Sequence, residues 1–378
     1  MSTIAVNAIT DANDGNTTTI NGVTPNSANV VGKNLIINGA MQIAQRGTSV
    51  TGQTTSGYKT CDRWAVVASS LNSNAFSCSQ DSDAPAGFAN SFKVEADTQL
   101  SLNSNSIFYV RQIIESQNLQ HLAYGSASPK TITVSFWVKS NVVGDYTCSL
   151  FRADGSRTTG KAYSITSSNT WEYKTLTFVG DTSDPMGNDA EFGMHIAHFL
   201  ATGTDQKSGT FTDGTWQNYN INNYATPNQV NFFNSSSNYW QITGVQLEVG
   251  ESATEFEHRP YGMELQLCQR YLPWFGSGTD DQIGIGYATG STTWLIFIPW
   301  KVQTRVAPTG IIHGTDSNFN VGGPTSSGIA CTALNFSAAG TSGGRVTGSV
   351  SSGLSSGQGT FLRSQNTSGY LYFTGCEL

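Results

Sequence analysis

The feature that most constrains the fold is a series of short apolar runs that starts near Asn34, with turn signals roughly every 8–15 residues. Residues 131–139, Thr-Ile-Thr-Val-Ser-Phe-Trp-Val-Lys, alternate almost perfectly, as a strand buried on one face does. Similar runs lie at 146–152, 171–179, 191–200, 239–247, 283–287, 294–301, 329–336 and 369–373. Many strands joined by polar, Gly- and Asn-rich turns predict an all-β chain built as a jelly-roll β-sandwich.

Two segments depart from the strand pattern and predict short helices. Residues 107–122 carry apolar side chains that are loosely spaced for one helical face. In residues 260–272, Leu265, Cys268 and Leu272 share one face at i, i+3 and i+7, and a proline follows.

These patterns divide the chain into four parts. Residues 1–33 are polar and nearly free of large apolar side chains, so they either stay disordered or become ordered against other subunits or a larger particle. We favour the second alternative and interpret them as a particle-attachment arm. The arm is followed by a jelly-roll sandwich at 34–260, a linker helix at 261–274 and a smaller C-terminal β-sandwich at 275–378.

The charge composition excludes several classes of function. Charged residues make up 12% of the chain, about half of the roughly 25% usual in soluble domains, and the net charge is −7. Clustered cations that would neutralise phosphates are missing, so we expect no nucleic-acid partner. The longest strongly apolar stretch, residues 294–300, is far shorter than the roughly 20 residues that span a bilayer, so we expect no membrane insertion.

The N-terminus and the cysteines point to synthesis in a cytoplasm. Residues 1–7 have neither the basic nor the apolar region of a secretory signal. The six cysteines are scattered without a CxxC pair, which predicts reduced, buried thiols rather than disulfides or a zinc site. We expect the protein to stay in that cytoplasm or to leave it as part of a particle.

Three segments resemble a known family. Residues 34–47, Asn-Leu-Ile-Ile-Asn-Gly-Ala-Met-Gln-Ile-Ala-Gln-Arg-Gly, are followed by Tyr-Lys-Thr-Cys-Asp-Arg-Trp at 58–64. Residues 239–260 contain Gln-Leu-Glu-Val-Gly and then Phe-Glu-His-Arg-Pro. These motifs resemble the opening and closing strands of phage tail-fibre and virion proteins of the marine or cyanophage type. The resemblance is good over 34–275 and weak over 276–378.

The resemblance implies a structural virion protein with a jelly roll of the carbohydrate-binding-module type. It implies a homotrimer, attachment to other virion proteins through residues 1–33, and host attachment, to a surface glycan, through the distal domain at 275–378. A tail fibre or related appendage is our first interpretation, and a capsid decoration or head-fibre protein is the alternative. The family supplies no catalytic residues and no cofactor.

Two charged motifs are interpreted as structural. In Asp62-Arg63-Trp64 we expect a buried arginine–carboxylate pair beside the indole that fixes the first strand, because buried charges must be paired. We expect Glu257 and Arg259 to form a second pair of this kind.

An aromatic loop is the candidate glycan-binding site. Sugars bind to aromatic faces, with amide and carboxylate groups accepting hydrogen bonds from hydroxyls. The loop at 211–224 has this composition, and its candidate ligand residues are Asp213, Trp216, Tyr219 and Tyr224. Residues 271–275 have the same character, and either segment could instead be buried against a neighbouring subunit.

Catalysis and metal binding are expected to be absent. Glu95 and Asp97 share one strand face, but Gln99 stands where a further acid would be, so a glycosidase pair is incomplete. His195 and His198 point to opposite faces if their segment is a strand, which argues against a metal site. Residues 11–15 offer oxygen ligands for calcium but lack the full EF-hand spacing, so a calcium site in the jelly roll stays an open alternative without assigned residues. The alternative in which the protein is an enzyme is a depolymerase that cuts host polysaccharide.

Overall fold

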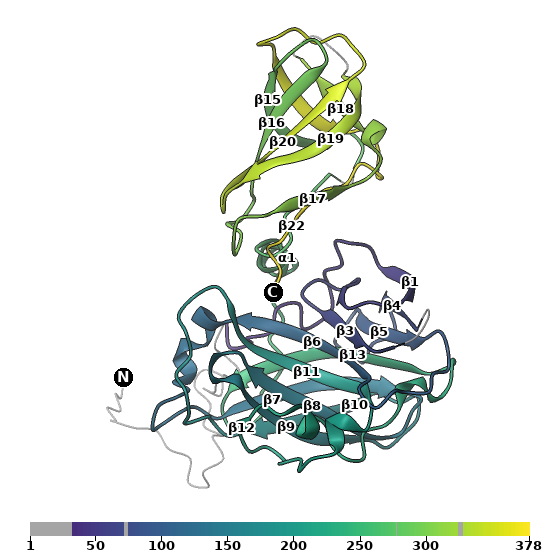
Figure 1. Cartoon of the computed structure of the whole chain (residues 1–378), viewed down its shortest axis with the longest axis vertical. Coiled ribbons are helices and arrows are strands. Elements are labelled where there is room, and N and C mark those ends of the chain that lie inside the picture. The colour runs from purple at the N-terminus through teal and green to yellow at the C-terminus, as the bar shows by residue number, and fades with distance from the viewer. Residues whose placement is uncertain (1–31, 72–74, 277, 324–327) are drawn as a thin grey trace, which may run out of the picture.

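The computed structural model describes residues 32–71, 75–276, 278–323 and 328–378 (Figure 1). The predicted arm at 1–33 therefore lies outside the described residues except for its last two. The chain is all-β, as predicted, with one α-helix in the described part, α1 (Tyr261–Gln269). No helix among these residues is long and apolar enough to cross a membrane.

The described residues between Ser49 and Val249 form a jelly-roll β-sandwich of two antiparallel sheets. The six-stranded sheet has the order β1 (Ser49–Gln53), β4 (Phe76–Asp81), β5 (Ser91–Ala96), β13 (Tyr239–Val249), β7 (Ile132–Ser140) and β10 (Glu172–Phe178). The seven-stranded sheet has the order β12 (Gln217–Asn218), β9 (Arg157–Ile165), β8 (Gly144–Arg152), β11 (Phe192–Thr202), β6 (Ile107–Glu115), β3 (Ala65–Ser69) and β2 (Gly57–Tyr58). Short 3-10 turns in the connections are Ser116–Leu122, Asp154–Ser156, Asp205–Lys207, Ile221–Asn223 and Phe232–Asn234.

The core of the sandwich follows from strand alternation. In β7, the side chains of Ile132, Val134, Phe136 and Val138 are fully buried between the sheets, in a cluster that includes Ile196 of β11. Successive side chains of a strand point to opposite faces, so the alternate residues of β7 lie on the outer face of the six-stranded sheet. That outer face carries the candidate site.

The expected helix at 107–122 is wrong over its first part. Residues Ile107–Glu115 form β6, which pairs with β3 on one side and β11 on the other, and only Ser116–Leu122 is helical, as a 3-10 turn. Both faces of β6 are covered, since Tyr109 and Val110 are 7% and 0% exposed. A strand covered on both faces shows no alternation, so periodicity could not separate it from a buried helix.

The C-terminal part has its own core and closes into a barrel where a smaller β-sandwich was expected. The barrel strands, at the top of Figure 1, are β15 (Gln282–Ala288), β16 (Thr293–Pro299), β20 (Gly343–Val350), β19 (Ile329–Ala339), β18 (Phe319–Gly322) and β21 (Gly359–Ser364). A three-stranded sheet of β14 (Trp274–Phe275), β22 (Leu371–Thr374) and β17 (Gly310–His313) lies between the barrel and α1, and a 3-10 turn spans Asp316–Asn318.

Glycines inside the barrel strands allow neighbouring strands to approach closely. A Cβ atom on Gly286 would lie 1.9 Å from the carbonyl oxygen of Leu295, and one on Gly348 would lie 2.1 Å from that of Ala333. Strands can approach and coil this closely only where a side chain is missing. The sequence contained these glycines, but their role depends on the register of the pairing.

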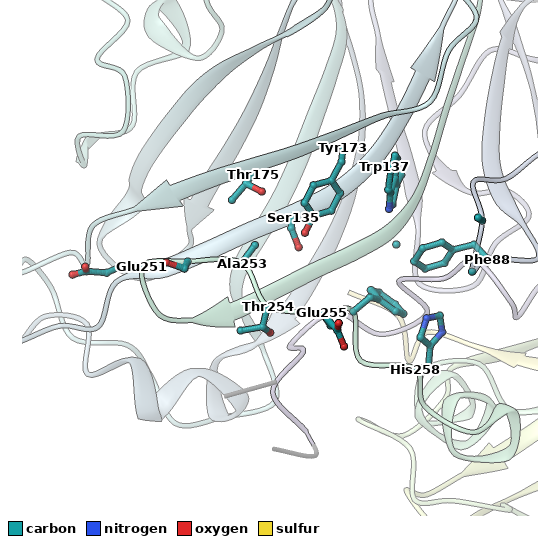
Figure 2. Close-up of a pocket in the computed structure, with 15 residues that line it drawn as sticks. Phe88, Ser135, Trp137, Tyr173, Thr175, Glu251, Ala253, Thr254, Glu255 and His258 are labelled. Carbon is teal, nitrogen blue, oxygen red and sulfur yellow. The ribbon is translucent and has the colours of Figure 1, made fainter. Parts of the chain in front are cut away.

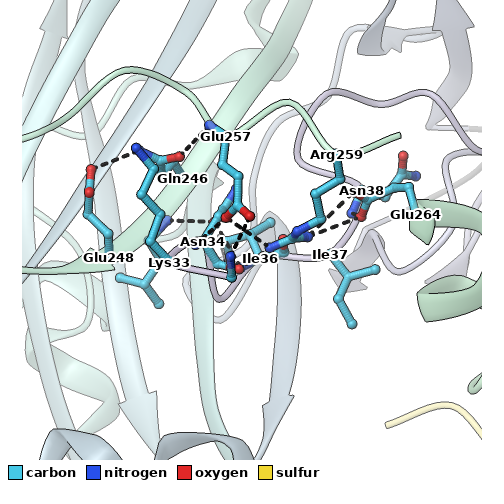
Figure 3. Close-up of polar contacts among 12 residues, drawn as sticks. Lys33, Asn34, Ile36, Ile37, Asn38, Gln246, Glu248, Glu257, Arg259 and Glu264 are labelled. Carbon is cyan, nitrogen blue, oxygen red and sulfur yellow. Dashed lines mark hydrogen bonds and ion pairs between the residues drawn. The ribbon is translucent and has the colours of Figure 1, made fainter. Parts of the chain in front are cut away.

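The start of the sandwich is held against its end by a polar cluster that we call the clasp, residues 32–38 together with 257–264 (Figure 3). Glu257 accepts hydrogen bonds from the backbone N–H groups of Gly32 (2.6 Å) and Asn34 (2.8 Å). Arg259 donates to the carbonyl oxygens of Asn34 and Ile36. Its guanidinium lies 3.7 Å from the Glu257 carboxylate, the pairing expected from the sequence.

The clasp also includes α1. The Glu264 carboxylate of this helix lies 3.4 Å from the Arg259 guanidinium and accepts a hydrogen bond from the backbone N–H of Asn38. Residues at the start and at the end of the sandwich sequence are thereby bound to the helix that leads to the barrel.

The motif Asp62-Arg63-Trp64 is buried, with exposures of 1%, 1% and 0%. No ion pair of Arg63 occurs within the described residues, so the expected pairing with a carboxylate is wrong. Arg63 has a left-handed backbone (φ 71°), and its guanidinium donates to the carbonyl oxygen of Ile113 and lies 3.4 Å from the centroid of the Tyr271 ring. Asp62 instead accepts hydrogen bonds from the backbone and side chain of Gln45.

Candidate functional site

An open groove of about 960 Å³ lies on the outer face of the six-stranded sheet (Figure 2). Its floor is formed by β7, β10 and β13, and its walls by the loop at 86–88 and by residues 251–258, which we call the strap. The lining residues are Ala86, Gly87, Phe88, Ser135, Trp137, Tyr173, Thr175, Gly244, Glu251, Ser252, Ala253, Thr254, Glu255, Phe256 and His258.

Two aromatic side chains stand together on the floor. Trp137 of β7 lies directly opposite Tyr173 of β10 in the antiparallel register, and Ser135 lies opposite Thr175 one step along. The rings of Trp137 and Tyr173 have their centroids 5.2 Å apart with a 50° angle between their planes. Tyr173 is 46% exposed, so the floor offers an accessible aromatic surface beside hydroxyl groups.

Three rings close one end of the groove. Phe88, Phe256 and His258 contact one another at centroid distances of 4.9 to 5.3 Å. Their packing depends on Gly244, which has φ +62° at an irregularity in the pairing of β13 with β7. A Cβ atom on Gly244 would lie 2.6 Å from the Phe88 ring, so a side chain here would displace that wall.

The strap is fixed in place by hydrogen bonds on its inner side. The buried carboxylate of Glu248 accepts from the backbone N–H (2.9 Å) and the hydroxyl (2.6 Å) of Thr254. Gln246 accepts from the backbone N–H of Glu257 (2.8 Å), and Lys33 donates to the Thr254 hydroxyl and the Glu255 carbonyl oxygen at 2.6 Å each (Figure 3). A wall held in this way needs little ordering when a ligand binds.

The loop predicted as a ligand site has much of its aromatic surface covered. Trp216 is 8% exposed, donates its indole N–H to the carbonyl oxygen of Val179 (2.8 Å) and packs edge-on against Tyr124. Tyr224 is 5% exposed and its hydroxyl lies 2.9 Å from Nε2 of His195. Burial raises the pKa of Tyr224 well above its usual range and lowers the pKa of His195 well below its own.

The other two predicted residues remain exposed. Tyr219 is 38% exposed and contacts the Tyr224 ring edge-on at 5.2 Å. The exposed Asp213 accepts a hydrogen bond from the backbone N–H of Ala162 (3.3 Å). The structure thus brings Tyr219 and Tyr224 into contact, whereas Trp216 packs against a different residue, Tyr124.

The aromatic residues at 271–275, which were the alternative ligand-binding segment, pack against other parts of the protein. Tyr271 is 1% exposed, and its ring packs against Arg63. Trp274 stacks on Tyr372 with centroids 4.7 Å apart and planes 9° apart.

The acids weighed for catalysis have local partners, and the histidines weighed for metal binding are buried. Glu95 lies 2.8 Å from the ammonium group of Lys93, and Asp97 accepts from the Ser77 hydroxyl at 2.7 Å. His198 lies in the core against Phe136, and burial lowers its pKa to about 3.

All six cysteines are free and buried, as predicted. Within the described residues, no cluster of three or more His, Cys, Asp or Glu side chains could hold a metal ion.

The residues that the sequence analysis missed are Trp137 and Tyr173. The alternation that predicted a strand at 131–139 also places Trp137 on the polar face, beside Thr133 and Ser135. A large aromatic side chain on the solvent face of a strand is the available signal. The position of Tyr173 beside it depends on the pairing of β7 with β10.

Comparison with solved structures finds distant matches with low sequence identity and low TM-scores. One is the enzymatically active domain of tailspike protein 4 of bacteriophage CBA120, with a TM-score of 0.32 and 11% identity over 58% of this chain. This chain spans 22% of the length of that domain. No protein-family model matches the sequence, and no curated protein matches it.

Two carbohydrate-binding modules are also similar. One is the TmCBM61 module in complex with β-1,4-galactotriose (TM-score 0.27, 12% identity, 57% of this chain and 99% of that chain). The other is the CBM22-1 xylan-binding domain from Paenibacillus barcinonensis Xyn10C (TM-score 0.25, 8% identity, 54% of this chain and 94% of that chain).

Proposed function

We propose that the protein binds carbohydrate, without cleaving it, in the groove on the six-stranded sheet. The observation that carries this proposal is the pair of contacting rings, the half-buried Trp137 and the exposed Tyr173, at the floor of a preformed groove. The apolar face of a sugar ring packs on an aromatic ring, and its hydroxyls need nearby donors and acceptors. Ser135 and Thr175 supply hydroxyls beside the two rings, and the strap supplies carboxylates.

A binding assay with matched variants tests the site. The intact protein is screened on immobilised polysaccharides, and Trp137→Ala and Tyr173→Ala are compared with Tyr219→Ala, which removes an exposed tyrosine of the loop predicted from the sequence. Loss of binding in the first two variants, with Tyr219→Ala unchanged, supports the groove. Loss only in Tyr219→Ala would assign binding to the loop and refute the proposal for the groove.

The same preparation tests the absence of catalysis. After incubation with each bound polysaccharide, we expect no new reducing ends. Release of oligosaccharide that Glu95→Gln abolishes would instead identify a depolymerase.

We propose further that the chain is a virion appendage of a tailed phage, a homotrimeric tail fibre that attaches to a host-surface glycan. This proposal rests on the motifs at 34–64 and 239–260, the low charge content and the polar arm at 1–33. Light scattering on the purified full chain tests the trimer, because a monomer at micromolar concentration would contradict it. Labelling of intact virions with a specific antibody would distinguish the tail from the capsid.

A further inference from the structure

The charged groups around the groove are mostly acidic. Glu251 and Glu255 lie on the strap, both exposed, and both line the groove (Figure 2). Within the described part of the chain, neither carboxylate takes part in an ion pair or a side-chain hydrogen bond. All lysines and arginines of the sequence lie in that part.

The cations nearest to the strap are already compensated. Lys33 donates to the Thr254 hydroxyl, which itself donates to the Glu248 carboxylate, so the ammonium charge is balanced by a buried acid. Arg259 lies between the Glu257 and Glu264 carboxylates. Two cations therefore face five carboxylates over the strap, the clasp and the end of β13, a net charge of −3; the groups are Lys33, Arg259, Glu248, Glu251, Glu255, Glu257 and Glu264.

Two further cations beside the floor, Lys139 and Lys174, are paired as well. Lys139 lies 2.5 Å from the Asp83 carboxylate, and Lys174 lies 2.6 Å from that of Glu172. No lysine or arginine is among the residues that line the groove. A ligand in the groove therefore meets hydroxyl groups, aromatic rings and uncompensated carboxylates.

Resting on the proposed function, we infer that the groove takes uncharged glycans and discriminates against glycans that carry carboxylate or sulfate groups. Carboxylates of the strap accept hydrogen bonds from sugar hydroxyls, and they repel an anionic ring in the same position. Repulsion between like charges lets a site discriminate between ligands, and it adds little to the affinity for the preferred ligand.

The test uses the full chain and a matched pair of ligands. The neutral polysaccharide that binds best is compared with the same polysaccharide after oxidation of its C6 hydroxymethyl groups to carboxylates. We expect the Kd of the oxidised form to be at least about fivefold higher than that of the neutral form at 50 mM salt. The difference should be smaller at 500 mM salt, because salt screens exposed charges.

A charge variant separates repulsion from the loss of a C6 contact. Glu251→Gln combined with Glu255→Gln should reduce the discrimination to about twofold or less. The control variant, Asp205→Asn combined with Asp280→Asn, removes the same number of charges far from the groove and should discriminate as the wild type does.

Two results would overturn the inference: equal or tighter binding of the oxidised form by the wild type, or unchanged discrimination in the Gln variant. Either result leaves the proposed function standing, provided that Trp137→Ala still abolishes binding. Unchanged binding of the neutral polysaccharide by Trp137→Ala would refute the proposed function itself.

Discussion

Truncation of Tyr173 is the most direct test of the groove, because its side chain is exposed and its loss should leave the fold intact. A tyrosine presents roughly 200 Å² of surface, so an exposure of 46% leaves about 90 Å² accessible to a ligand. A sugar ring stacked on one face covers about half of that area, which corresponds to about 1 kcal/mol at roughly 25 cal/mol per Å². Direct ring contacts add about 0.5–1 kcal/mol.

We therefore expect Tyr173→Ala to weaken binding by about 1–2 kcal/mol, or roughly 5- to 30-fold in Kd. Tyr173→Phe keeps the ring and should stay within about threefold of the wild type, unless the hydroxyl makes a hydrogen bond to the ligand. Isothermal titration with the best-binding oligosaccharide measures both variants, and the melting temperature of each variant checks its fold. A folded Tyr173→Ala protein with unchanged Kd would refute the reasoning.

Three further predictions concern stability. His198 has a pKa of about 3 in the folded state and about 6.5 when unfolded, so its contribution is fully present above pH 6.5 and falls by about 1.4 kcal/mol per pH unit towards pH 3. Urea unfolding between pH 7 and 4 should show a shallower loss for His198→Leu than for the wild type, and identical slopes would contradict this. Gly244→Ala should lower the free energy of unfolding by about 1–3 kcal/mol and weaken glycan binding, since it strains a positive φ and displaces the Phe88 ring; an unchanged melting curve and Kd would refute it. Asp181→Asn should cost about 3–5 kcal/mol in chemical unfolding because it leaves Arg152, which lies 2.6 Å from the carboxylate and is buried, without its charge partner; a loss below about 1 kcal/mol would show that this pair matters little.

Much of the fold could be predicted because single strands carry their own signal. The alternation at 131–139 gives β7, and the spacing at 260–272 gives α1. Residues 107–115 had no such signal, since both faces of β6 are covered. Closure of the barrel could not be predicted, because the role of each glycine depends on the strand register that places it beside a carbonyl oxygen of the neighbouring strand.

The candidate site was harder to predict for the same reason. An aromatic loop attracted the prediction, but Trp216 and Tyr224 are largely buried. The alternation at 131–139 already placed Trp137 on the outer face of its strand. The pairing that brings Tyr173 beside it, and the strap that closes the groove, arise from contacts between segments far apart in the chain.

The clasp determines how the protein carries tension. When Gly32 and the barrel are pulled apart, we expect part of the force to pass from residues 32–36 through Glu257 and Arg259 to α1. The path also reaches the six-stranded sheet at β13, because Asn34 is hydrogen-bonded to Val245 and Leu247 of that strand and Leu35 donates its backbone N–H to Leu247. We therefore expect a pulling force to be borne by the clasp and β13, and to reach β7 and β10, the other strands of the groove floor, only through their pairing in the sheet.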